Sequence, residues 1–468
     1  MNCKWLIPAL TIGAAMMFSA CGDDPSATSS TPVVVPDNPG TPAQPDPGTG
    51  TEPQQPVAQA YGILPTTANP AITDAWYAAW KGTYYKSYVE EAALYPILAA
   101  DWTEIFGTYT AAGMYPARII WDTNDDSYCV IDECTNSYKK RGCTVSEGIG
   151  YGMLITLFAG DIDAFNSLWY YSKGYRDYRG GHNLTPWRTG TYSYDALVQQ
   201  ANASSATDAD LDIATSLILA YYMTQNPAYL NDAIAIATSI WELEISPTFM
   251  IYSGNMATWK KETSAYNLSY FSPIAIKLFA LVDPNHPWQN VLDKMYTYMQ
   301  TVQAAGPGML PDWSDVNGVA IDPKNGSATK TYWRFFHEAV RIPWRIAWDY
   351  YWTQDTRAQQ VLTGMNNFIS SKTGGDPTKL SAEAGTHIYS AVTGMADSTL
   401  KKENLQGHFH GAWCLTGMGG NQAWIDGCTA EFNARTLSGF SYFPHILMTM
   451  YSQFLNGRFV KPATLPAI

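Results

Sequence analysis

The chain has 468 residues, of which 46% are hydrophobic and 15% are charged, so it can form a large core and lacks the charge density of a disordered protein. Its 28 Lys and Arg stand against 41 Asp and Glu, and the resulting net charge of -13 argues against a nucleic-acid partner. Aromatic residues make up 14% of the chain, an excess that indicates flat apolar faces on which sugar rings or peptides can lie, and carbohydrate is the first candidate.

Residues 1–20 have the pattern of a secretory signal. An apolar run that ends at Phe18 follows Lys4, and it is too short to span a bilayer. Residues 18–21, Phe-Ser-Ala-Cys, resemble a bacterial lipobox, in which the cysteine becomes the acylated first residue of the mature chain. We therefore expect lipidation of Cys21 and display at the cell surface, on the outer membrane. An ordinary cleaved signal, and hence a secreted protein, is the alternative.

Residues 21–60 are interpreted as a disordered tether. The part from 22 to 57 has no aromatic residue, and its nine prolines are mixed with Thr, Ser, Gly, Asp and Gln, so it cannot bury a core. No second linker of this kind follows. We therefore expect residues 61–468 to form one folded domain, and we expect it to be a monomer.

Alanine-rich amphipathic stretches recur along this domain, and long alternating β runs are scarce. The clearest helices are predicted at 149–159, 208–223, 229–243, 273–282, 288–302, 343–352, 357–370 and 443–455, with weaker ones at 72–80, 90–106, 163–173 and 385–395. About a dozen helices predict an all-α fold, and a toroid whose loops gather at one end would accommodate them.

Five cysteines remain in the domain: Cys129, Cys134, Cys143, Cys414 and Cys428. An exported chain can form disulfides, and Cys414 is expected to pair with Cys428 because no other cysteine is near that end of the sequence. One pair and one spare thiol are expected among the other three. A zinc site that includes His408 and His410 is the rival interpretation, but no paired CxxC spacing exists and no metal is expected.

The first candidate stretch for chemistry is residues 144–153, Thr-Val-Ser-Glu-Gly-Ile-Gly-Tyr-Gly-Met. Ser146 can cap a helix and Glu147 then falls in its first turn, while the three glycines leave room for a bulky group to approach the backbone. An acid that merely complements the helix dipole is the alternative. The glycines argue against it, because they weaken a helix start that needed only a charge.

The second stretch, residues 205–214, carries Asp208, Asp210 and Asp212 after a capping Thr207. Asp210 can simply complete a capping turn, but three carboxylates within five residues repel one another, which tends to raise a pKa or to favour a ligand.

The third stretch, residues 336–345, places Glu338 and Arg341 at the mouth of a helix that Pro343 begins. A purely structural ion pair is the alternative, although exposed pairs contribute only about 0–1 kcal/mol.

Five motifs then occur in a fixed order. They are Ser-Glu-Gly and Tyr-Gly-Met within 146–153, Ala-Thr-Asp-Ala-Asp at 206–210, Ser-Tyr-Phe-Ser-Pro at 269–273, Leu-Pro-Asp-Trp at 310–313, and Ala-x-Arg-x-Pro-Trp-Arg at 339–345. In this order the chain resembles glycoside hydrolase family 8 over most of residues 115–352. The resemblance implies an (α/α)6 barrel with its active-site cleft at one end, and hydrolysis of a β-1,4-linked polysaccharide with inversion at the anomeric carbon.

The resemblance also implies roles. Glu147 matches the general acid, Asp208 the carboxylate at the distorted sugar, Arg341 the arginine that holds the base, and Tyr270 an aromatic residue near the catalytic water. Trp187 and Trp313 are expected to be sugar platforms, and Asp210 is grouped with them in substrate binding.

Two features depart from the family's pattern. Where many members have Tyr-Asp before Ala-x-Arg, this chain has His337-Glu338, so the expected base is Glu338, with its carboxylate displaced by about 1.5 Å. The segment from Asp122 to Cys143 looks like an insertion that could reshape one end of the cleft.

We therefore expect an endo-acting β-1,4-glucanase on cellulose or mixed-linkage glucan, held on a membrane through its lipid anchor. Chitosanase and xylanase are the alternatives within the family, and an inactive glycan-binding lipoprotein is the alternative from another class. No cofactor is expected, because two carboxylates and water suffice for the reaction.

Overall fold

The computed structural model describes residues 63–94, 96–121, 144–189, 204–256, 265–319, 334–397, 407–437 and 439–468. The chain divides into two units, 1–55 and 56–468, and all described residues belong to the second. The signal, the tether with Cys21, the segment 122–143 and its three cysteines lie outside the described residues.

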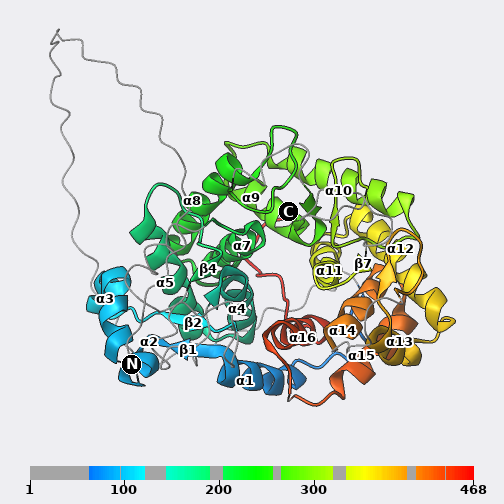
Figure 1. Ribbon diagram of the computed structural model, residues 1–468, viewed down its shortest axis with the longest axis horizontal. Helices are drawn as coiled ribbons and strands as arrows, with labels where there is room; N and C mark the ends of the chain where they lie inside the picture. The colour runs from blue at the N-terminus through cyan, green and yellow to red at the C-terminus, as the bar shows by residue number, and fades with distance from the viewer. Residues whose placement is uncertain are drawn as a thin grey trace, which may run out of the picture. The chain divides into compact units, whose positions relative to one another are not determined.

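Six of the described helices form a closed inner ring. In chain order they are α4 (Ser146–Ala159), α7 (Thr207–Thr224), α9 (Pro273–Val282), α11 (Ile342–Thr353), α14 (Gly407–Leu415) and α16 (Tyr442–Leu455). Each contacts the next, and α16 returns to contact α4 (Figure 1).

An outer helix packs against each member of this ring. The outer helices are α1 (Ile72–Tyr84) on α16, α5 (Ile162–Arg179) on α4, α8 (Pro227–Glu244) on α7, α10 (Trp288–Ala305) on α9, α12 (Thr356–Thr373) on α11 and α15 (Gln422–Asn433) on α14. This double ring is an (α/α)6 barrel, so the predicted fold is confirmed.

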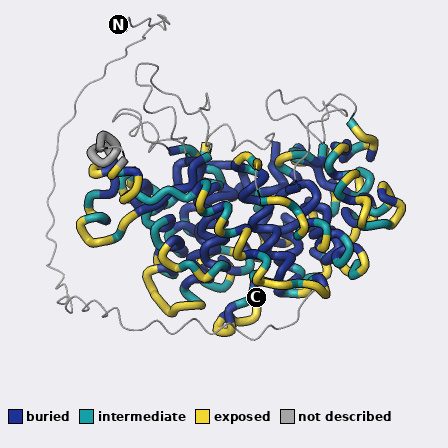
Figure 2. The backbone as a smooth tube through the Cα atoms, turned by 90° about the horizontal axis from the view of Figure 1, so that it is seen from below, coloured by how far each residue is buried: buried dark blue, intermediate teal, exposed yellow. Residues whose placement is uncertain are grey.

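The two rings differ in their burial pattern. Every residue of α4 from Gly148 to Phe158 is buried, whereas α10 buries one face at positions three or four apart, from Trp288 to Val302. A helix that is apolar on all sides belongs in an interior, and a helix with one apolar stripe belongs at a surface. Figure 2 shows the buried backbone gathered in the middle, with exposed segments around it.

Two predicted helices differ in the structure. The stretch 90–106 is divided between α2 (Tyr88–Leu94) and α3 (Pro96–Ala111). The stretch 385–395 is not a helix: α13 (Leu380–Thr386) ends there, β8 (Tyr389–Ser390) follows, and Gly394 has a φ of 68° that a helix does not allow. Among the described residues, no helix has the length and apolar character needed to cross a membrane.

Short antiparallel strand pairs lie at the N-terminal ends of the inner helices. They join β3 (Thr144–Val145) to β4 (Arg188–Thr189), β5 (Tyr266–Asn267) to β6 (Trp313–Ser314), and β7 (Arg334–Phe335) to β8. One further pair joins β1 (Tyr85–Ser87) to β2 (Ala117–Ile119). The strands β3, β5 and β7 directly precede the starts of α4, α9 and α11, the last two through short 3-10 turns.

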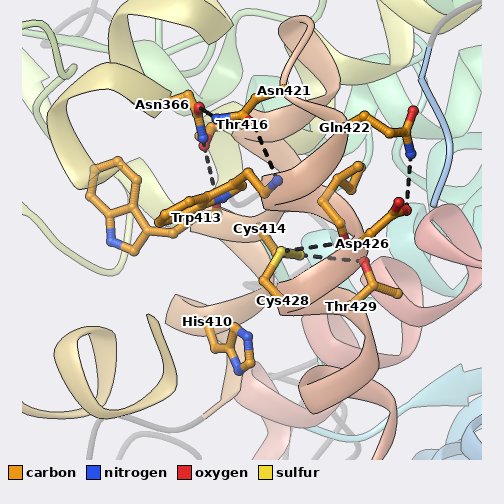
Figure 3. The surroundings of a disulfide bond; sticks show 12 residues. Asn366, His410, Trp413, Cys414, Thr416, Asn421, Gln422, Asp426, Cys428 and Thr429 are labelled. Atoms are coloured by element: carbon orange, nitrogen blue, oxygen red, sulfur yellow. Dashed lines mark hydrogen bonds between the residues drawn. A yellow bond between two sulfur atoms is a disulfide. The ribbon is translucent and has the colours of Figure 1, made fainter. Parts of the chain in front are cut away.

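A disulfide joins Cys414 of α14 to Cys428 of α15, the pair expected from the sequence (Figure 3). It links an inner helix to its outer partner. The hydroxyl of Thr429 lies 3.4 Å from the Cys414 sulfur. Since the Cys414 sulfur is in the disulfide, it is not available as the thiolate beside His408 and His410 in the rival zinc site.

Candidate active site

A cavity of about 620 Å³ opens at the N-terminal end of the inner helices. Of the residues proposed from the sequence, it brings together Glu147, Trp187, Asp208, Tyr270, Glu338 and Arg341. The other lining residues are mostly aromatic or small: Trp121, Val145, Ser146, Ala206, His337, His408, Phe409, Ser441, Tyr442, Phe443 and Pro444.

Arg341 connects the three carboxylates of this cavity. Its Nη1 donates to Glu147 Oε2 at 2.6 Å and to Asp208 Oδ2 at 2.8 Å, and its Nη2 donates to Glu338 Oε2. The arginine lies in a 3-10 turn, η2 (Ala339–Arg341), directly before α11, and its side chain is only 3% exposed. A buried guanidinium needs such partners, and it fixes their positions relative to one another.

Glu147 is the second residue of α4, and its side chain is 17% exposed. Burial and the nearby charge of Asp208 raise its pKa to about 7, although Arg341 and the hydroxyl of Tyr442 act in the opposite direction. Tyr442 donates to Glu147 Oε1 at 3.0 Å. A carboxyl with a pKa near neutrality can hold a proton and deliver it, which is the property of a general acid.

The glycines beside Glu147 serve packing. A Cβ at Gly148 would lie 2.9 Å from the Tyr442 hydroxyl, and one at Gly150 would lie 3.0 Å from Cβ of Asp212 and 3.1 Å from the Ala209 carbonyl. The space that we expected a bulky ligand to use is therefore occupied by α16 and α7. The absence of side chains lets Tyr442 reach the acid and lets α4 and α7 pack closely.

The three aspartates at the start of α7 have three different environments. Asp208 lines the cavity and accepts from its neighbour's backbone N–H, whereas Asp212 receives both Nη1 and Nη2 of Arg345, at 2.7 and 2.8 Å. Asp210 is fully buried and accepts from the Thr185 N–H at 2.8 Å. Asp210 is thus placed behind the cavity and not among its lining residues, and its contribution to substrate binding stays a prediction.

Glu338 is held from two sides. Asn267 Nδ2 donates to its Oε2 at 2.5 Å, in addition to the bond from Arg341. Its side chain is 32% exposed, so it remains accessible from the cavity.

The turn that carries Glu338 is fixed by Asp312. Asp312 Oδ1 accepts from the N–H groups of Phe336 at 3.0 Å and Ala339 at 2.7 Å, which lie on either side of the His337-Glu338 pair. Burial raises the pKa of Asp312 to about 6, and the two N–H groups act against that rise.

Two of the three aromatic candidates, Tyr270 and Trp187, line the cavity, and Trp313 does not. The guanidinium of Arg341 lies 5.4 Å from the centre of the Tyr270 ring, and Trp187 is 37% exposed at the cavity. Trp313 lies in β6, packs against Ala265 and does not line this cavity, so its role as a sugar platform stays a prediction. Asp349, the next acid after Glu338, lies buried in α11 and pairs with Lys277 at 2.7 Å.

Tyr442, Asn267 and Asp312 are site residues that the sequence argument did not select. Asp312 lies within the Leu-Pro-Asp-Trp motif, which was a usable signal. No local sequence signal indicates Tyr442 or Asn267. Their partners, Glu147 and Glu338, are 295 and 71 residues away along the chain.

A protonatable carboxyl and two further carboxylates in an aromatic cavity form the kind of acid–base site that acts on glycosidic bonds. Comparison with known families agrees: residues 121–406 match the family described as Glycosyl hydrolases family 8. The chain belongs to this family.

Individual relatives are similar over shorter spans. The chain is 31% identical over 239 residues to Endoglucanase C of Ruminiclostridium cellulolyticum. The aligned region covers 49% of this chain and 47% of that protein. It is 27% identical over 322 residues to the Beta-glucanase of Niallia circulans, covering 64% and 78%. The chain thus spans about half the length of the first of these relatives.

The fold is also that of solved structures. The apo structure of a Beta-1,3-1,4-glucanase from Paenibacillus sp. X4 aligns with a TM-score of 0.65 at 23% identity, and it covers 87% of this chain and 99% of the other. This likeness supports the barrel assignment.

Proposed function

We propose that the protein is an inverting glycoside hydrolase that cleaves internal β-1,4 linkages of cellulose or mixed-linkage β-glucan. One observation carries the proposal: Glu147 and Glu338 contact the two terminal nitrogens of a single guanidinium in an aromatic cavity. An inverting enzyme needs an acid on one side of the scissile bond and a base with a water on the other.

In this mechanism Glu147 gives its proton to the leaving oxygen as the bond from that oxygen to the anomeric carbon breaks. Glu338 accepts a proton from a water molecule, whose oxygen bonds to the same carbon from the opposite face. The product therefore has the inverted configuration, and the two carboxyls return to their starting states by exchanging protons with solvent. Arg341 keeps both carboxyls in register, and its bond to Asp208 holds a negative charge near the positive charge that develops on the sugar.

Two observations favour a neutral glucan over chitosan. The relatives above are named as glucanases. Among the described lining residues, the only carboxylates are Glu147, Asp208 and Glu338, and each is engaged by Arg341. The cationic amino groups of chitosan would call for an additional carboxylate, because a buried cation needs a partner.

The test is incubation of the purified protein with carboxymethylcellulose, mixed-linkage β-glucan, xylan and chitosan. New reducing ends are measured together with the fall in viscosity, which is steep when internal bonds are cut. We expect the two glucans to be cleaved fastest, and Glu147→Gln to lose most of the turnover. Preference for xylan or chitosan would overturn the substrate assignment. Binding of glucan without any new reducing ends would support an inactive binding protein instead.

We also propose that Cys21 is lipidated and holds the protein on the outer membrane. The support is the Phe-Ser-Ala-Cys sequence at 18–21 and the proline-rich tether behind it. Cys21→Ser should move the protein from the membrane fraction to a soluble fraction and leave its hydrolytic activity unchanged. A wild-type protein that is already soluble would contradict the anchor.

A further inference from the structure

The backbone that presents Trp187 to the cavity is held between two other segments. The Trp187 N–H donates to the Ser204 carbonyl at 2.8 Å, and its own carbonyl accepts from the Ser146 N–H at 2.9 Å. The preceding residue, Pro186, forms an antiparallel bridge with Ser205. The orientation of the exposed indole therefore depends on how the segments at 184–187 and 204–205 are fixed.

Two buried acids from neighbouring helices fix these segments. Asp210 of α7 accepts from the Thr185 N–H at 2.8 Å, two residues before Trp187. Glu244, the last residue of α8, accepts from the Ser205 hydroxyl at 2.6 Å. Asp210 thus holds the segment that contains Pro186, and Glu244 holds the segment that contains Ser205. Both acids are completely buried.

The surroundings of Asp210 favour its uncharged form. Its Oδ2 has no hydrogen-bond partner among the described residues. Arg176 and Arg179 of α5 both contribute nearby positive charge. Both terminal nitrogens of Arg176 bind Asp232, at 2.9 and 2.6 Å. Nη1 of Arg179 donates to the Leu184 carbonyl at 3.3 Å. Burial and the neighbouring Glu244 raise the pKa of Asp210 well above its ordinary value. A buried carboxyl without an ion-pair partner holds a proton in preference to a charge.

We propose that Asp210 and Glu244 are positioning residues that hold Trp187 as a platform for one sugar ring of the bound polysaccharide. Asp210 acts through the Thr185 N–H and Glu244 through the Ser205 hydroxyl. Neither acid touches the substrate. The inference rests on the proposed function, because it assumes that a glycan occupies the cavity. It gives a role at the site to Asp210, which was selected from the sequence but does not line the cavity.

The test compares Asp210→Ala with Asp210→Asn. The amide is neutral and keeps an oxygen that can accept from the Thr185 N–H, so Asp210→Asn should retain the KM of the wild type. Asp210→Ala should raise KM for soluble β-glucan about two- to tenfold, the factor that an aromatic contact contributes, with kcat within about twofold. Asp349→Ala is the matched control: it removes an equally buried acid from α11, remote from Trp187, and should leave KM unchanged.

A double variant separates positioning from general destabilisation. In a Trp187→Ala background the platform is already absent, so adding Asp210→Ala should raise KM no further. Ser205→Ala removes the hydroxyl that Glu244 holds and should raise KM alone but not in that background, which keeps the test available if Asp210→Ala does not fold. The inference would be overturned if the changes in KM caused by Trp187→Ala and Asp210→Ala multiplied in the double variant. It would also be overturned if Asp210→Asn raised KM as much as Asp210→Ala.

Binding measurements make the inference independent of turnover. The Kd of cellohexaose is measured by titration calorimetry in a Glu147→Gln background, with and without the Asp210 and Trp187 changes. The same two- to tenfold loss is expected. If the wild type fails to hydrolyse any glucan but this pattern of Kd values holds, the proposed reaction fails and the positioning role stands. If hydrolysis is normal and Kd does not change, only the positioning role fails.

Discussion

The hydroxyl of Tyr442 donates to Oε1 of Glu147 at 3.0 Å, the oxygen that Arg341 leaves free when it binds Oε2. Both bonds stabilise the ionised carboxylate and so lower the pKa of Glu147, whereas burial and the charge of Asp208 raise it. Burial has the largest effect, and the pKa lies at about 7. As the pH rises through this value, Glu147 loses the proton that the leaving oxygen needs. Activity should therefore fall on the alkaline side.

The part of the pH profile in which activity falls with rising pH is its alkaline limb. Tyr442→Phe should move this alkaline limb to higher pH. The variant removes a bond that favours the charged form, so the pKa of Glu147 should rise by on the order of one unit. The measurement is the pH profile of kcat/KM on soluble β-glucan. Tyr229→Phe, which removes a tyrosine hydroxyl bonded to Asn166 on the outer ring, should leave the limb in place. A limb that moves to lower pH in Tyr442→Phe would contradict this account of the acid.

Asp208→Asn should move the same limb in the opposite direction. Its negative charge raises the pKa of Glu147, so a neutral amide should lower that pKa and bring the loss of activity to a lower pH. The maximal rate should also fall, because the charge beside the developing positive sugar is lost. An unchanged limb would show that Asp208 and Glu147 are not electrostatically linked.

Glu338→Ala should lose about 10²- to 10⁴-fold in kcat, the usual contribution of a general base. Added azide should restore part of the rate, because this nucleophile needs no deprotonation. Glu338→Asp should keep measurable activity, since it retains the carboxylate on a shorter arm. Near-normal turnover by Glu338→Ala would place the base elsewhere, and the acidic segment 122–132, which lies outside the described residues, would be the first alternative.

Removal of the disulfide tests stability apart from catalysis. The paired variant Cys414→Ser with Cys428→Ser opens a link between residues 14 apart, and the free energy of unfolding should fall by about 3 kcal/mol. Urea denaturation followed by circular dichroism measures the change, and kcat at low temperature should not change. Reduction of the double variant is the control, because any further loss of stability that it causes comes from another disulfide. A double variant as stable as the wild type would show that the bond does not support α14 against α15.

The sequence was sufficient for the elements that have a local signature. Amphipathic spacing predicted the barrel helices except α14 and α15, and the proline signal predicted where α11 begins. Thr207 lies at the start of α7 as expected, but its side chain makes no capping bond. The helix predicted at 385–395 failed because apolar spacing outweighed Gly394 in that assignment, although a positive φ there ends any helix.

The site was predictable where its residues form motifs and was not where they depend on tertiary contacts. Glu147, Asp208 and Arg341 belong to motifs. Tyr442 meets Glu147 only because α16 closes the ring against α4, which no local pattern indicates. Asp210 shares a motif and a helix with Asp208, but residues two positions apart on a helix point in different directions. It therefore lies outside the cavity, which the motif alone does not indicate.

The most direct test of the central claim is the anomeric configuration of the first product. Proton NMR follows the wild-type protein on cellohexaose or mixed-linkage β-glucan, with enough enzyme that cleavage outpaces mutarotation. If Glu147 is the acid and Glu338 activates a water on the opposite face, the α-anomer signal appears first and the β-anomer grows in later by mutarotation. A β-anomeric first product would contradict the inverting mechanism and the role given to Glu338.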